Sequence, residues 1–247
     1  LSQKRVGSLE EAEKELSSCD ADIAYSWHDA SAGSNFGRGI VYIGQWTGNS
    51  ARPKPMKFRP MTANSRARLP FSAWNGLTAR VANSTVLLHS RFKKNVSVTS
   101  VMDASFPFAS NVYFHKLFGK RGLREAQFLV SEDKIGECSH ALHKLVCDTG
   151  ASTMMLSLKR FKGVQKSLSM SGTLYIVAID SYRNAKTDLF MHRLDQLILD
   201  MGVQPNLSKD SRIPGEVAEL SIASFAEFKQ SLFAYDKSRT MRSELSL

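Results

Sequence analysis

The sequence predicts an α+β fold, in which an antiparallel β-sheet is backed by helices on one face. From residue 125 onward, the patterns follow the order strand, helix, strand, strand, helix, strand. This split β-α-β order is typical of ferredoxin-like units, whose helices cover one side of an antiparallel sheet. The first half of the chain repeats a degraded form of the same order, so we expect two unequal ferredoxin-like halves.

The first half begins with a helix and two strands. Residues 8–18 predict a helix, because Ser8 can cap it and Glu11 stands at the spacing of a capping box. Residues 23–28 and 39–46 have the apolar patterns of strands, and the Gly/Ser-rich loop between them indicates a hairpin.

A long basic loop follows the hairpin. Residues 47–68 are rich in Pro, Lys, Arg, Asn and Met and contain no acidic residue, which is typical of a functional surface loop. Residues 96–102 return to strand-like alternation. Between them, residues 71–92 predict a helix whose apolar face carries Trp74, Leu77, Val81 and Leu88.

The second half is more regular. Strand patterns cover residues 125–130, 154–161 and 173–180. Two amphipathic helices are predicted as well, over residues 134–148 and 187–201. Each of these is followed by a glycine suited to a left-handed C-terminal cap, Gly150 and Gly202.

The composition is that of a folded chain. Of 247 residues 43% are hydrophobic, which excludes a disordered chain. No run reaches the roughly 18–20 apolar residues of a membrane-spanning helix. The three cysteines, Cys19, Cys138 and Cys147, form no CxxC pair, and no secretion signal follows Leu1, so we expect free thiols and a cytoplasmic protein.

The formal net charge of +10 favours an anionic partner, such as a phosphorylated substrate, a membrane surface or nucleic acid. The alternative is that the charges are spread over solvated surfaces. A metal site could be drawn from His140, His143 and Cys147, which share one stripe of a predicted helix, but no fourth ligand stands nearby and we expect no metal.

Two basic segments are candidates for ligand binding. In residues 206–212, Lys209 and Arg212 flank Asp210, and the alternative is an exposed turn with a local salt bridge. At the end of the strand over residues 154–161, alternation places Lys159 and Phe161 on one face. Lys159 would then be half-buried on a Met-rich side, which indicates a ligand.

Five short motifs occur in one order across nearly the whole chain. They are DxxA at 29–32 with GRG at 37–39, LPF at 69–71, FGKRGL at 118–123, LKRF at 158–161 and LSKDSR at 207–212. With them the chain resembles FAD-linked oxidases of the vanillyl-alcohol-oxidase superfamily, and within it the decaprenylphosphoryl-ribose oxidase family. The resemblance implies that residues 1–247 are the substrate (cap) domain of a flavin oxidase with its C-terminal return, and that FAD is bound mainly by an N-terminal domain absent from this chain.

The resemblance also implies roles for particular residues. Lys209 matches the lysine beside the flavin and the hydroxyl being oxidised, so it is the candidate catalytic and cofactor-binding residue. It could accept the hydroxyl proton, if burial lowers its pKa, or hold the hydroxyl as an ammonium. The candidate substrate-binding residues are Gln127, Lys159, Phe161, Glu125, Phe106 and Arg212. Glu125 stands where the family has glutamine, and Phe106 stands near a tyrosine position.

The function implied is oxidation of a secondary alcohol of a sugar, by hydride transfer to flavin N5. Departures from the family pattern at Leu174, Ile176 and Ala178 reshape the pocket, so the resemblance predicts the enzyme class but not the particular sugar. A phosphorylated sugar, linked to a lipid or nucleotide, is expected because the basic loop over residues 52–68 could receive its phosphate. Peripheral membrane association and a partner reductase fit this function, and nucleic acid is not expected. The alternative is a non-catalytic basic module that binds anionic lipid or nucleic acid.

Overall fold

The strands form one antiparallel sheet. The computed structural model describes residues 1–48, 69–92, 96–105, 116–163, 168, 171–210, 212–238 and 240. Within these residues seven strands pair in the order β1-β3-β2-β5-β6-β4-β7. The strands are β1 (Ser2–Val6), β2 (Ile23–Asp29), β3 (Gly39–Gly44), β4 (Leu123–Val130), β5 (Thr153–Gly163), β6 (Gly172–Tyr182) and β7 (Gln204–Pro205).

The sheet consists of two ferredoxin-like parts. The second part has the spatial order β5-β6-β4-β7, which is the arrangement of a complete split β-α-β unit. The first part has the order β1-β3-β2 and lacks a fourth strand. Strands β2 and β5 pair along the line between the two parts, with Tyr25 opposite Lys159, so that both belong to a single sheet. The predicted α+β class is therefore confirmed.

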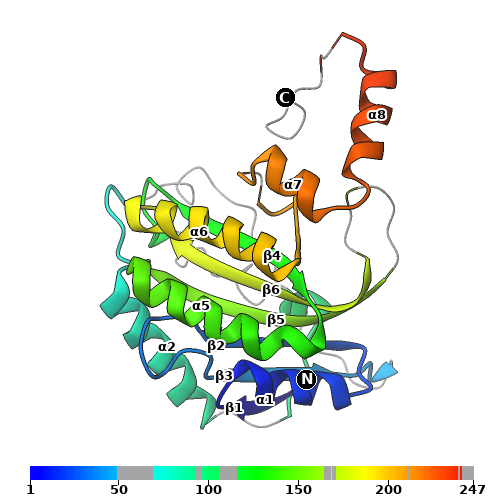
Figure 1. Ribbon diagram of the computed structural model, residues 1–247. Helices are drawn as coiled ribbons and strands as arrows, with labels where there is room; N and C mark the ends of the chain where they lie inside the picture. The colour runs from blue at the N-terminus through cyan, green and yellow to red at the C-terminus, as the bar shows by residue number, and fades with distance from the viewer. Residues whose placement is uncertain are drawn as a thin grey trace.

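Three helices cover one face of this sheet. They are α1 (Leu9–Ser18), α5 (Ile135–Thr149) and α6 (Ala185–Met201), which lie in front of the strands in Figure 1. The Ser8 side chain accepts the N–H of Glu11 at the start of α1, as the sequence predicts. Helices α5 and α6 both end at a glycine with positive φ, Gly150 at 61° and Gly202 at 60°.

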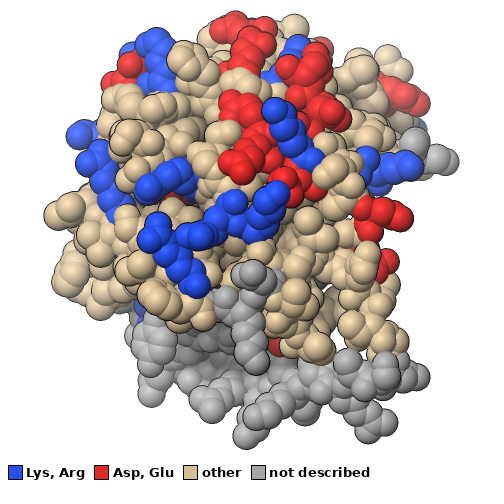
Figure 2. Space-filling view, turned by 90° about the horizontal axis from the view of Figure 1, so that it is seen from below, with Lys and Arg blue, Asp and Glu red and all other residues tan. Residues whose placement is uncertain are grey.

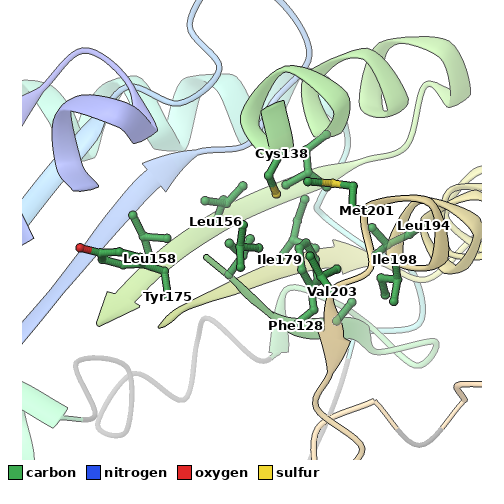
Figure 3. Close-up of a cluster of buried hydrophobic side chains, with 14 of the residues drawn as sticks. Phe128, Cys138, Leu156, Leu158, Tyr175, Ile179, Leu194, Ile198, Met201 and Val203 are labelled. Atoms are coloured by element: carbon green, nitrogen blue, oxygen red, sulfur yellow. The ribbon is translucent and has the colours of Figure 1, made fainter. Parts of the chain in front are cut away.

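The main hydrophobic core lies between these helices and the sheet. Figure 3 shows Phe128, Leu156 and Ile179 from the strands meeting Cys138 of α5 and Ile198 of α6. All five are at most 1% exposed. Burial of this kind stabilises a fold by roughly 1.5–3 kcal/mol for each large apolar side chain.

Helix α2 (Gly76–Ser90) lies on the opposite face, and its predicted apolar face is wrong. Three of the side chains expected inside are exposed: Leu77 (71%), Val81 (59%) and Leu88 (53%). The helix instead buries Ala79 and Asn83. Because these inward side chains are small, the helix can lie close to the sheet.

Asn83 attaches α2 to the sheet. Its amide donates to Oδ1 of Asp29 at 2.7 Å and to the carbonyl of Met154 at 3.0 Å. Because buried polar groups need such partners, this residue fixes which side of α2 faces inward. The position of the helix therefore depends on a polar contact that apolar periodicity does not reveal.

The remaining described helices are short. They are α3 (Val101–Ser105), a 3-10 turn η3 (Glu132–Lys134), α7 (Gly215–Ser221) and α8 (Phe225–Tyr235). Residues 96–102, expected as a strand, contribute one bridge from Val96 to Ser2 and the start of α3. The basic loop over residues 52–68 lies outside the described residues. Within the described chain, no helix has both the length and the apolar content to cross a bilayer.

A buried histidine makes the folded state less stable at low pH. His28 is fully buried, its Nδ1 lies 2.7 Å from the carbonyl of Gly37, and its Nε2 lies 2.6 Å from Oγ of Ser26. Burial lowers the pKa of His28 to about 4, although the bond to Gly37 opposes this. The native state therefore resists a proton that the unfolded chain takes up below pH 6.5.

We expect the free energy of unfolding to fall by about 3 kcal/mol as the pH drops from 6.5 to 4 through this residue alone. Urea unfolding of the wild type and of His28→Gln across this range measures it. Glutamine cannot titrate, so the difference between the two proteins should shrink steadily with acid. A constant difference would show that His28 has an ordinary pKa.

Candidate functional site

Polar side chains gather on the sheet face opposite α1, α5 and α6. Side chains alternate along a strand, so residues paired across strands share a face. Glu125 on β4 lies opposite Asp180 on β6, and Gln127 lies opposite Ala178. Lys159 on β5 lies opposite Ile176, four residues from Asp180 on β6 and therefore on the same face. The register thus places Glu125, Gln127, Lys159 and Asp180 together.

A tight turn after β7 brings Lys209 to this group. The backbone N–H of Asn206 donates to the carbonyl of Gln127 at 2.7 Å, and its side-chain amide donates to Oε1 of Gln127 at 2.9 Å. The carbonyl of Asn206 then accepts the N–H of Lys209 at 3.0 Å. Gln127 extends this hydrogen-bond network to Glu125, because its side-chain amide donates to Oε1 of Glu125 at 2.5 Å. The turn is therefore attached to β4 by side chain and backbone alike.

Asp180 is the electrostatic centre of the group. The residue is 8% exposed, and burial raises the pKa of its carboxyl group from 3.8 to about 7. The negative charge of Glu125 raises the pKa further, whereas the ammonium groups of Lys159 and Lys209 lower it. A carboxyl group with this pKa can gain or lose a proton near neutral pH, which is a common property of functional sites.

The structure places several predicted site residues together. Gln127 is 7% exposed and Glu125 is partly buried, whereas Lys209 is exposed. Lys159 is exposed too, so the expectation that it is half-buried is wrong; it lies on the face of β5 that α1, α5 and α6 do not cover. Phe161, two residues further along the same face, is partly buried. Phe106 lies outside the described residues.

Arg212 is held elsewhere, in a buried ion-pair network. Its Nη1 lies 2.7 Å from Oδ2 of Asp195 on α6, and its Nη2 lies 2.9 Å from Oδ2 of Asp210. The side chains of Arg212, Asp195 and Asp210 are 15%, 8% and 3% exposed. Burial raises the pKa of Asp210, and the Arg212 guanidinium opposes the rise. These contacts give Arg212 the role of fastening the Lys209 turn to α6.

Two other side-chain groups have structural explanations. His143 stacks on Phe36, with ring centroids 4.8 Å apart, and within the described chain no three His, Cys, Asp or Glu side chains are grouped to hold a metal. Ser26 and His28 form a hydrogen-bonded pair like that of a hydrolase, but both are 0% exposed. A substrate cannot reach a nucleophile in that position.

Sequence reasoning missed Asp180 as a site residue. Its signal is a charged residue that continues the alternation of Leu174, Ile176 and Ala178, on the face of an apolar strand that is turned away from the main core. A carboxylate among such positions is unusual, because burial of an unpaired charge is costly.

Comparison with models of known protein families gives no match for this chain. No curated protein is similar enough to it to count as a relative. The group around Asp180 is therefore interpreted from its own chemistry.

Proposed function

We propose that this chain is the substrate-binding part of an FAD-dependent oxidoreductase, which oxidises a secondary alcohol of a sugar. The observation that carries the proposal is the grouping of Lys159, Lys209, Glu125 and Gln127 around Asp180 on one sheet face. Four of these are the residues that the resemblance to flavin oxidases assigns to the site. They come from three segments that lie far apart in the sequence, β4, β5 and the turn after β7, so chance alone is a poor explanation of their meeting.

The chemistry of the group suits a polyhydroxylated ligand. Ammonium groups donate hydrogen bonds, carboxylates accept them, and the amides of Gln127 and Asn206 do both. A sugar presents hydroxyl groups that need donors and acceptors at close spacing. The two exposed ammonium groups also favour a substrate that carries a phosphate.

Proton transfer near neutral pH is available at this face. Oxidation of an alcohol requires that the hydroxyl proton leave as the carbon loses its hydride. We assign Lys209 to hold the hydroxyl oxygen, and Asp180, with its pKa of about 7, is a group that can accept the proton. The charge of Glu125 helps to keep the pKa of Asp180 high. This explains why a glutamate would stand at a position where the flavin oxidases have glutamine.

The donor set is compatible with a flavin. FAD, bound mainly by a domain outside this sequence, would supply the acceptor for the hydride. Lys209 is the residue of this chain that would contact it, because a cation near the ring stabilises a reduced, negatively charged flavin.

The test uses the full-length gene product that contains this sequence. Bound flavin is first identified by its visible spectrum, and candidate sugar phosphates are then mixed with it without oxygen. Lys209→Ala is expected to slow flavin reduction by about a hundredfold or more while flavin remains bound. Lys162→Ala is the matched control, because Lys162 is an exposed lysine on β5 whose position in the alternation points it to the other face. Absence of flavin, or equal loss of binding and reduction, would contradict the proposal.

A further inference from the structure

A second polar site lies at the other end of the sheet. A pocket of about 570 Å³ opens between β1, the start of β3 and α2, a volume typical of small-molecule sites. It is lined by Arg5, Val6, Gly7, Arg38, Ser84, Leu87, Leu88 and Arg91. Strands β3 and β2 separate β1 from β5, so the β1 side of the pocket lies about 14 Å from the strand that carries Lys159.

Three arginines give the pocket a strong positive charge. Arg5, Arg38 and Arg91 all line it, and none of the described lining residues is acidic. Across the described chain, no ion pair involves any of the three, in contrast to Arg212.

The walls of the pocket are fixed by the fold. The backbone of Arg38 is held by its carbonyl, which accepts the N–H of Asp29 at 2.8 Å. The amide of Gln3 donates to the carbonyl of Ser90 at 3.3 Å and ties β1 to the end of α2. Asn83 fastens the middle of α2 to the sheet, as described above. The arginines therefore project from anchored elements rather than from a free loop.

An acidic side chain at the rim of the pocket binds the backbone. The Glu11 carboxylate accepts the N–H of Gly7 at 2.6 Å, so it is turned to the backbone of the pocket rim. Figure 2, which views the molecule from the side of β1, α1 and α2, shows a band of basic side chains that adjoins an acidic group with basic side chains inside it.

We propose that this pocket binds a phosphate monoester whose remaining part is apolar. A phosphate dianion has several oxygens that guanidinium groups can bind in pairs, and three arginines match its charge. The Ser84 hydroxyl can add one more donor. Leu87, Leu88 and Val6 provide apolar surface beside the arginines. Inorganic phosphate would leave this surface uncovered, whereas the apolar part of a phosphate monoester would cover it. This proposal does not depend on the proposed oxidoreductase function.

Binding is measured by titrating the protein with inorganic phosphate and with hexyl phosphate, while the side-chain Nε signals of arginine are followed by NMR. Hexyl phosphate should bind more tightly than inorganic phosphate and should shift the Arg38 signal. Arg5→Gln and Arg91→Gln should each weaken binding about tenfold. Both residues are exposed, so neither change threatens the fold.

Arg193→Gln is the control, because it removes one exposed positive charge from α6, away from the pocket. If Arg193→Gln weakened phosphate binding as much as the pocket variants do, the effect would be one of net charge and the proposed site would be wrong. Failure of both phosphates to bind would also overturn it. Binding to phosphatidylcholine vesicles with and without phosphatidic acid shows whether the phosphate belongs to a lipid headgroup or to a dissolved ester. Arg91-dependent binding to the acidic vesicles would assign the pocket to a lipid headgroup, and hexyl phosphate binding alone would assign it to a dissolved phosphate ester.

Discussion

Arg212→Met is expected to lower the free energy of unfolding by about 3–5 kcal/mol. The substitution keeps much of the side-chain volume but leaves Asp195 and Asp210 buried without their cation. Removal of one partner from a buried ion pair is far more costly than replacement of the whole pair, because an uncompensated charge remains out of water.

Urea unfolding at neutral pH measures the loss, and Arg193→Met, an exposed arginine on the same helix α6 as Asp195, is the control. That control should change stability by less than about 0.5 kcal/mol. The comparison also separates two interpretations of Arg212. If this arginine served mainly to bind substrate, its replacement would leave the unfolding free energy nearly intact.

Asp180→Asn is expected to stabilise the protein above pH 7 and to have no such effect below pH 4. The folded-state pKa of about 7 lies above the ordinary value of 3.8, so the native state holds a proton that the unfolded chain has already released between these values. Stability from this group is therefore fully present below pH 3.8 and is lost as the pH rises through 7. The loss amounts to about 4 kcal/mol, which asparagine avoids.

The difference in unfolding free energy between Asp180→Asn and wild type, followed from pH 4 to 8, isolates this contribution from that of His28, whose sign is opposite. Glu125→Gln provides a second check. Because the Glu125 charge raises the pKa of Asp180, its removal should move the titration of Asp180 to lower pH. A difference between Asp180→Asn and wild type that does not vary with pH would refute the raised pKa.

The second half of the fold could be predicted from the sequence, and the first half only in part. Helices α5 and α6 have regular apolar stripes and terminal glycines, so periodicity alone locates them. Strand β1 has the sequence SQKRV, in which the pattern is too short and too basic to be distinguished from a loop. The apolar face of helix α2 was predicted wrongly, because its inward residues are small or polar and its large apolar residues face outward.

The candidate site was partly predictable for a different reason. Gln127, Lys159 and Lys209 are site residues only by a predicted resemblance to flavin oxidases, which the comparisons with known proteins do not test. Asp180 interrupts the apolar alternation of β6, but its raised pKa depends on burial and on the register that sets Glu125 opposite it, which the sequence alone does not supply. The pairing of Arg212 with Asp195 likewise joins residues seventeen positions apart, on α6 and the turn after β7.

The order of strands also bears on how this protein behaves in crowded solution. The longest strands, β5 and β6, have eleven residues each and lie inside the sheet, where both of their edges are paired. The two outer strands, β1 and β7, have only five and two residues, and β1 carries Lys4 and Arg5. A neighbouring polypeptide that tried to extend the sheet at β1 would find a short and charged template, so this edge is protected against fibrillar aggregation.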